Sequence, residues 1–182
     1  MKNHIILSII LALGLVFTAQ AQPKQPTVWS VKTVANKTAT VDGSLRDGIK
    51  LGDLSWAWNS SNACFPATQQ AKFTGNHVFF VTELPPRSIL TVTVIPKKAG
   101  VNLSVYGYQI AAGQTTLPEA LHSCVSCEAD HKWDYPKRGK TQGDERTMTF
   151  NATTNSYNVV IGVTGANGLT EGDFTLAVTL KQ

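Results

Sequence analysis

Two cysteines, a histidine and several acidic side chains lie close together in the stretch CVSCEADHKWD, which spans residues 124–134. Residues of these types can bind a metal, exchange electrons or form a covalent cross-link. Zinc takes four nitrogen or sulfur ligands in a tetrahedron, and this chain could supply them from Cys64, Cys124, Cys127 and His131. The choice among the three chemistries depends on the compartment in which the protein works and on the fold around the stretch.

The beginning of the chain predicts a cleaved signal peptide over residues 1–21. Lys2 gives a positive start, residues 5–17 are almost wholly apolar, and Ala19-Gln20-Ala21 has the small-x-small form of a cleavage site. The apolar run is shorter than the roughly 20 residues that a membrane helix needs. We therefore expect an exported protein, periplasmic or extracellular, whose mature chain of residues 22–182 has no membrane span.

An oxidising compartment makes a disulfide the default state of exported cysteines. A redox motif would instead need a helix N-terminus in a βαβ setting, which this sequence does not predict. We expect Cys64 to pair with Cys124 or Cys127, because closing a long loop removes more unfolded-state entropy than closing the short Cys124–Cys127 loop. One cysteine is then left over. Zinc remains the alternative, no metal site is favoured, and no cofactor is expected.

The charge of the chain gives little support for a nucleic-acid partner. The formal net charge is +4, and the basic residues are spread out except for one short group between Lys132 and Lys140. A single short basic loop is typical of a solvated surface. The length of the mature chain, roughly 160 residues, suits one domain.

Most of the mature sequence predicts β-strands. Apolar and polar residues alternate with a period of two between recurring turn residues, which is typical of an antiparallel β-sandwich or barrel. The predicted strands are 27–35, 38–43, 53–61, 71–84 with a break at Gly75-Asn76, 88–96, 101–110, 146–152, 156–163 and 172–180. Residues 110–145 lack a sustained strand pattern, so we expect one long loop there, and long loops of this kind are usually functional or clamped.

Strand motifs in the second half follow a familiar order: His77-Val78-Phe79-Phe80, Leu90–Val94, Asn102–Tyr106, Thr149–Ala152, Tyr157–Ile161 and Gly172–Val178. Over residues 70–180 this order resembles the bacterial pre-peptidase C-terminal domain family. The resemblance implies a jelly-roll-like β-sandwich of about eight strands. It also implies a non-catalytic domain, usually attached to secreted hydrolases, that acts in adhesion, substrate binding or processing. Asn102 stands where the family has an acid, which weakens the implication of a calcium site, and 110–145 is an insertion.

The histidines do not predict a catalytic site. Neither a Gly-x-Ser-x-Gly nor a His-Glu-x-x-His motif is present, and no catalytic residue is expected. His77 follows a turn at a strand start and is interpreted as a packed or turn histidine. His131 lies among Glu128, Asp130 and Asp134, whose oxygens could hold calcium. A solvated charged loop is the preferred interpretation of this stretch.

Aromatic residues are the best sequence signal for binding. Trp56 and Trp58 are two positions apart and would share one face of a strand, and Trp133 and Tyr135 repeat the spacing. Exposed aromatics can stack on sugar rings or contact a partner protein. Core packing is the competing interpretation, and it is favoured for Trp56 and Trp58.

Three functions follow from these observations. The preferred one is a secreted, non-catalytic module that binds a polysaccharide or protein partner at the cell surface or outside the cell. The second is a small exported, metal-assisted hydrolase that uses residues 122–134. The third is a structural envelope protein with no specific ligand.

Overall fold

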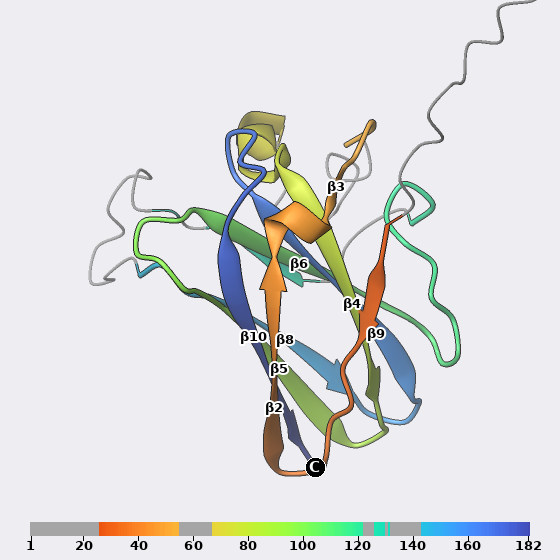
Figure 1. The fold of residues 1–182 in the computed structure, drawn as a ribbon. Helices are drawn as coiled ribbons and strands as arrows, with labels where there is room; N and C mark the ends of the chain where they lie inside the picture. The colour runs from red at the N-terminus through yellow and green to blue at the C-terminus, as the bar shows by residue number, and fades with distance from the viewer. Residues whose placement is uncertain (1–25, 55–66, 122–125, 130, 132–142) are drawn as a thin grey trace, which may run out of the picture.

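Two β-sheets face each other in the computed structural model, which describes residues 26–54, 67–121, 126–129, 131 and 143–182 (Figure 1). One sheet has six strands in the order β1-β4-β9-β6-β7, with β3 also paired to β4, and the other has the order β2-β10-β5-β8. This arrangement confirms the predicted all-β sandwich. The elements are β1 (Val28–Ser30), β2 (Lys37–Ser44), the 3-10 helix η1 (Leu45–Asp47), β3 (Ile49–Lys50), the 3-10 helix η2 (Ala67–Phe73), β4 (Asn76–Leu84), β5 (Ser88–Pro96), β6 (Leu103–Ala111), β7 (Ser126–Glu128), β8 (Arg146–Ala152), β9 (Tyr157–Gly165) and β10 (Asp173–Lys181).

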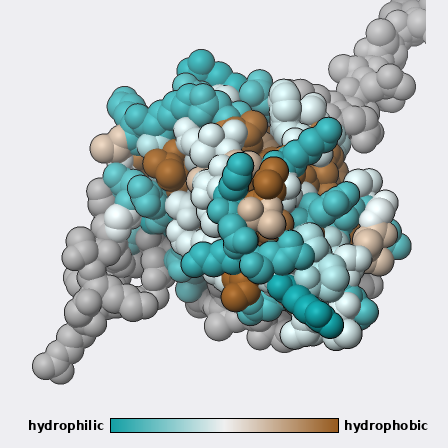
Figure 2. Space-filling view, turned by 90° about the horizontal axis from the view of Figure 1, so that it is seen from below, coloured by the Kyte–Doolittle hydropathy of each residue, from teal (hydrophilic) through white to brown (hydrophobic). Residues whose placement is uncertain are grey.

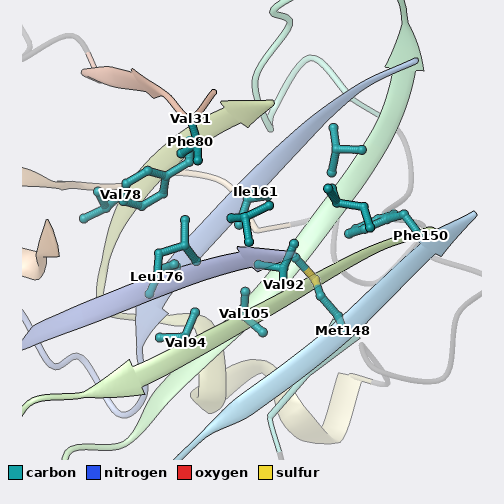
Figure 3. Packing of buried hydrophobic residues seen from close by; sticks show 14 of the residues in the cluster. Val31, Val78, Phe80, Val92, Val94, Val105, Met148, Phe150, Ile161 and Leu176 are labelled. Atoms are coloured by element: carbon teal, nitrogen blue, oxygen red, sulfur yellow. The ribbon is translucent and has the colours of Figure 1, made fainter. Parts of the chain in front are cut away.

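Alternation along the strands of the four-stranded sheet creates the core. In β5, Leu90, Val92 and Val94 are buried, whereas Thr91 and Thr93 between them reach solvent. The buried residues meet those of the opposite sheet, as Figure 3 shows for Phe80 and Ile161 on one side and Val92, Met148 and Phe150 on the other. Each such side chain contributes about 1.5–3 kcal/mol when it is fully buried.

The six-stranded sheet is buried on both faces in its centre. A second apolar cluster lies on its outer face, and it contains Phe73, Phe79, Tyr106, Tyr108, Cys127, Ala129 and Val160. Residues from η2 and from the segments around Leu51 and Leu117 pack over these strands, beside Cys127 of the edge strand β7. Strands with two buried faces have near-continuous apolar runs, and this explains the Val-Phe-Phe-Val sequence of β4.

Three details of the predicted strands are wrong. Residues 71–73 end the 3-10 helix η2 and are not a strand. β7 interrupts the predicted loop 110–145 and pairs with β6, and three residues are too few to show a period. β1 is only three residues long and runs parallel to β4, so the sandwich is not purely antiparallel.

The end of the sandwich at which the C-terminus lies is polar. Seen from the end at which the C-terminus lies, the described surface is largely hydrophilic with small, separate apolar areas (Figure 2). No helix among the described residues is long and apolar enough to cross a membrane. The predicted signal peptide and cleavage site lie outside the described residues and remain a prediction.

Candidate functional site

Most of the residues singled out in the sequence lie outside the described residues. These are the binding candidates Trp56, Trp58, Trp133 and Tyr135 and the cysteines Cys64 and Cys124. Their roles, and the pairing of the cysteines, therefore remain predictions. Cys127 and His131 are described, and both are buried, Cys127 in β7 at 9% exposure and His131 at 0%.

His131 does not lie in a solvated loop as expected. Its Nε2 is 3.1 Å from Oγ of Ser104 in β6, and its Nδ1 is 2.9 Å from Nη2 of Arg146 in β8. Ser104 is completely buried and donates its hydroxyl hydrogen to the carbonyl of Lys72, at 2.8 Å. The histidine thus joins both sheets of the sandwich to the segment that carries β7.

A serine beside a histidine could act as a nucleophile and its base, but the hydrogen-bond directions here oppose that role. A guanidinium only donates, so Nδ1 of His131 accepts from Arg146. In a neutral imidazole the other nitrogen then carries the hydrogen, and Nε2 donates to Ser104. A general base needs its lone pair directed at the serine hydroxyl hydrogen. The geometry of this pair is that of a structural link.

The same contacts bear on the zinc alternative. Both ring nitrogens of His131 already have partners in Ser104 and Arg146, so binding zinc would require breaking one of these contacts. Among the described residues, no group of three or more His, Cys, Asp or Glu side chains is close enough to hold a metal ion. His131 is therefore a poor zinc ligand, and this weighs against the zinc site formed by Cys64, Cys124, Cys127 and His131.

His77 is the packed histidine that its sequence position suggested. It begins the buried part of β4, with Nδ1 2.7 Å from the Tyr106 hydroxyl and Nε2 3.0 Å from the Phe73 carbonyl. A carbonyl only accepts, so Nε2 carries the hydrogen and Nδ1 accepts from Tyr106. Burial disfavours the charged ring and lowers the pKa of His77 to about 4, although the Phe73 carbonyl acts in the opposite direction.

This burial predicts a loss of stability in mild acid. Because the pKa of His77 is about 4 in the folded state and about 6.5 in the unfolded state, the unfolded chain binds an extra proton between these values. The stabilisation is complete above pH 6.5 and is lost as the pH falls toward 4, by about 3 kcal/mol in total. Urea unfolding at pH 7 and pH 4.5 measures this loss, and the His77→Gln variant should show a smaller one. An NMR titration that places the His77 pKa near 6.5 would contradict the prediction.

The outer face of the four-stranded sheet carries a different feature, a regular array of threonines. In one row, Thr38, Thr179, Thr91 and Thr149 are paired across β2, β10, β5 and β8. The next row has threonine on three of these strands and alanine on β10. We call this surface the threonine face, and its members are Thr38, Thr40, Thr91, Thr93, Thr147, Thr149, Thr175 and Thr179.

Local sequence and register together produce this face. Thr-x-Thr occurs at 38–40, 91–93 and 147–149, and the alternation of a strand puts both threonines of each motif on the outer side. The side chains of all eight threonines reach solvent, on the edge strands more than on the central ones. Adjacent strands lie about 4.8 Å apart and alternate residues about 6.8 Å apart. Seven of the hydroxyl groups therefore form a grid two rows wide over four strands, and Thr175 lies in the next row, opposite Asp42.

The two rows contain no ionisable side chain. Hydroxyls pair across strands, at 2.7 Å between Thr38 and Thr179 and at 2.9 Å between Thr93 and Thr147. Charge lies at the rim, where Lys97 contacts Asp42 at 2.7 Å and its hydrogen bond, with that of Thr175, lowers the pKa of Asp42. The centre of the face is thus neutral and rich in hydroxyl groups.

Comparisons with known proteins give fold-level similarity. No protein-family model and no curated protein matches the chain. A pre-peptidase C-terminal domain of collagenase from Bacillus anthracis is 12% identical, with 88% of this chain and 100% of that chain covered and a TM-score of 0.40. CorA, a surface-associated copper-binding protein of Methylomicrobium album BG8, is 10% identical, with 86% and 99% covered and a TM-score of 0.46. The periplasmic lysozyme inhibitor PliG of Aeromonas hydrophila is 14% identical, with 86% and 100% covered and a TM-score of 0.40. These values assign neither a family nor a function.

Proposed function

We propose that the chain is an exported, non-catalytic module that binds an uncharged polysaccharide through the threonine face. The observation that carries this proposal is the pair of in-register hydroxyl rows, with charged groups confined to the rim of the sheet. The sequence left two partner classes open, a polysaccharide and a protein, and we propose the polysaccharide.

The chemistry of the threonine face suits a neutral sugar polymer. A threonine hydroxyl offers one donor and two acceptor positions, as a sugar hydroxyl does, so each can replace the water of the other. One such hydrogen bond contributes only about 0.5–1.5 kcal/mol net. Binding then depends on many contacts along an extended chain, which four adjacent strands can provide. A neutral centre has no electrostatic attraction for phosphate or other anionic polymers.

A further observation supports a module without catalysis. The Nε2–H of His131 faces the Ser104 oxygen, so that histidine cannot remove the serine proton in this arrangement. We also propose that a disulfide ties the segment around β7 to the rest of the chain. The disulfide state of Cys127 supports this, and Cys64 is the partner that would make such a tie.

Pull-down on insoluble polysaccharides tests the function. We expect the protein to bind cellulose, chitin or an insoluble β-glucan, and to bind less to an anionic polymer. The variant Thr91→Val, Thr93→Val, Thr147→Val, Thr149→Val keeps the β-branched shape and loses four hydroxyls. Its affinity should fall by about tenfold or more.

The matched control makes the same chemical change elsewhere. Thr153 and Thr154 are exposed in the turn between β8 and β9, and their double change to valine should leave binding unaltered. Equal binding by the four-site variant would exclude the threonine face as the site. Failure of the native protein to bind any polysaccharide would favour a structural role.

A further inference from the structure

Strand β1 covers only part of the edge of β4. The two strands pair in parallel as far as Ser30 opposite Val81, and the last contact is the Val31 N–H to the Val81 carbonyl at 2.9 Å. Beyond this point the chain leaves the sheet, while β4 continues to Leu84 and stays paired with β9 on its other side. The final residues of β4 therefore have one neighbouring strand instead of two.

The direction of the free peptide groups follows from the strand pattern. Alternate residues of a strand direct their N–H and C=O to the same edge. Because the Val81 carbonyl points toward β1, the N–H and C=O of Glu83 point that way too. The next parallel contact would join the Glu83 N–H to the Val31 carbonyl, and within the described part of the chain no such hydrogen bond forms. Glu83 thus presents a donor and an acceptor on an open edge.

A pocket of about 450 Å³ lies at this open edge. Its walls come from residues 30–33 at the end of β1 and just after it, and from residues 81–83 of β4. Gly113 and Thr115 of the β6–β7 connection and Asn158 of β9 complete the lining. Thr82 lines the pocket and is 3% exposed, and its hydroxyl has no hydrogen-bond partner. A buried hydroxyl without a partner is costly, and a bound molecule that reaches it would supply the missing hydrogen bond.

We propose that this pocket binds an extended peptide segment of a partner protein, which adds to the β4 edge as a short strand. An N–H and a C=O at strand spacing are complementary to another extended backbone, as in other complexes formed by strand addition. The pocket admits about three residues, or roughly 10 Å of extended chain. The ammonium of Lys32 and the carboxylate of Glu83 lie among its lining residues and suit a polar peptide. This proposal does not depend on polysaccharide binding.

NMR titration of the isotope-labelled protein tests the proposal. The probe is a mixture of blocked tripeptides built from Thr, Lys and Glu, and the control probe is the same mixture N-methylated at every residue. We expect the Glu83 amide signal to shift and its hydrogen exchange to slow with the first mixture. The N-methylated mixture should produce neither effect, because its residues cannot donate backbone hydrogen bonds.

Two tryptophan variants locate the effect. Thr115→Trp should fill the pocket and weaken the peptide affinity by about tenfold or more, whereas Thr116→Trp changes the adjacent exposed residue, which does not line the pocket, and should have no effect. The proposal is overturned if no pocket amide shifts with the peptides, or if the N-methylated peptides bind as well. It is also overturned if cellotetraose shifts the same amides and the peptides do not.

Discussion

The Gly162→Ala variant is expected to lose about 3 kcal/mol of unfolding free energy or more. Gly162 lies in β9 between Phe79 of β4 and Tyr106 of β6. The Tyr106 ring lies over the glycine, so that an added methyl group would overlap the ring carbons Cζ and Cε2 and the hydroxyl. Tyr106 is fully buried and cannot move away without disturbing its neighbours.

The overlap has a second effect through His77. The Tyr106 hydroxyl donates to Nδ1 of His77, so displacement of the ring breaks a buried hydrogen bond as well as the packing. Overpacking in a core typically costs about 1–3 kcal/mol, and a lost buried partner adds about 1–3 kcal/mol. Urea unfolding measures the sum. Gly52→Ala is the matched control, because nothing lies within 4 Å of its added Cβ and its stability should be unchanged. Equal unfolding midpoints for the two variants would contradict the prediction.

The His131→Ala variant is expected to lose about 3 kcal/mol of unfolding free energy. It removes an acceptor for Nη2 of Arg146, which is 2% exposed, and the donor to Ser104, which is fully buried. Removal of one partner from a buried hydrogen bond costs more than the bond contributes, because the remaining group loses a partner that water cannot replace there.

A conservative variant separates hydrogen bonding from packing. The amide of His131→Gln can still accept from Arg146 or donate to Ser104, so it should recover part of the loss in urea unfolding. Lys98→Ala changes an exposed residue and should remain within about 0.5 kcal/mol of the native protein. If His131→Ala were as stable as Lys98→Ala, the contacts of His131 would contribute no stability.

Much of the fold is predictable because its strands obey local rules. β5 and β10 alternate strictly, since one face of each is in the core and the other reaches solvent. Two features escape this reasoning. The apolar run in β4 shows burial but cannot show that the segments around Leu51 and Leu117 pack on the outer face of the sheet, and three-residue strands such as β1 have too little sequence for any period.

The candidate site was only partly visible in the sequence. The Thr-x-Thr motifs at 38–40, 91–93 and 147–149 can be seen, but their assembly into rows depends on strand order, which brings Thr38 beside Thr179. The prediction that His131 lies in a solvated loop was wrong. Its charged neighbours suggested solvent, whereas its partners Ser104 and Arg146 come from distant strands that no local pattern reveals.

The position of β10 has a consequence for how the protein folds. This strand lies between β2 and β5, and it supplies Leu176, Val178 and Leu180 to the core. Until residues 173–181 are available, β2 cannot join β5 and β8 in one sheet, because within that sheet β2 pairs with β10 alone. Such distant pairings slow folding. A growing chain should therefore remain open until its last strand has been made, and a version truncated before Asp173 should expose the core and aggregate.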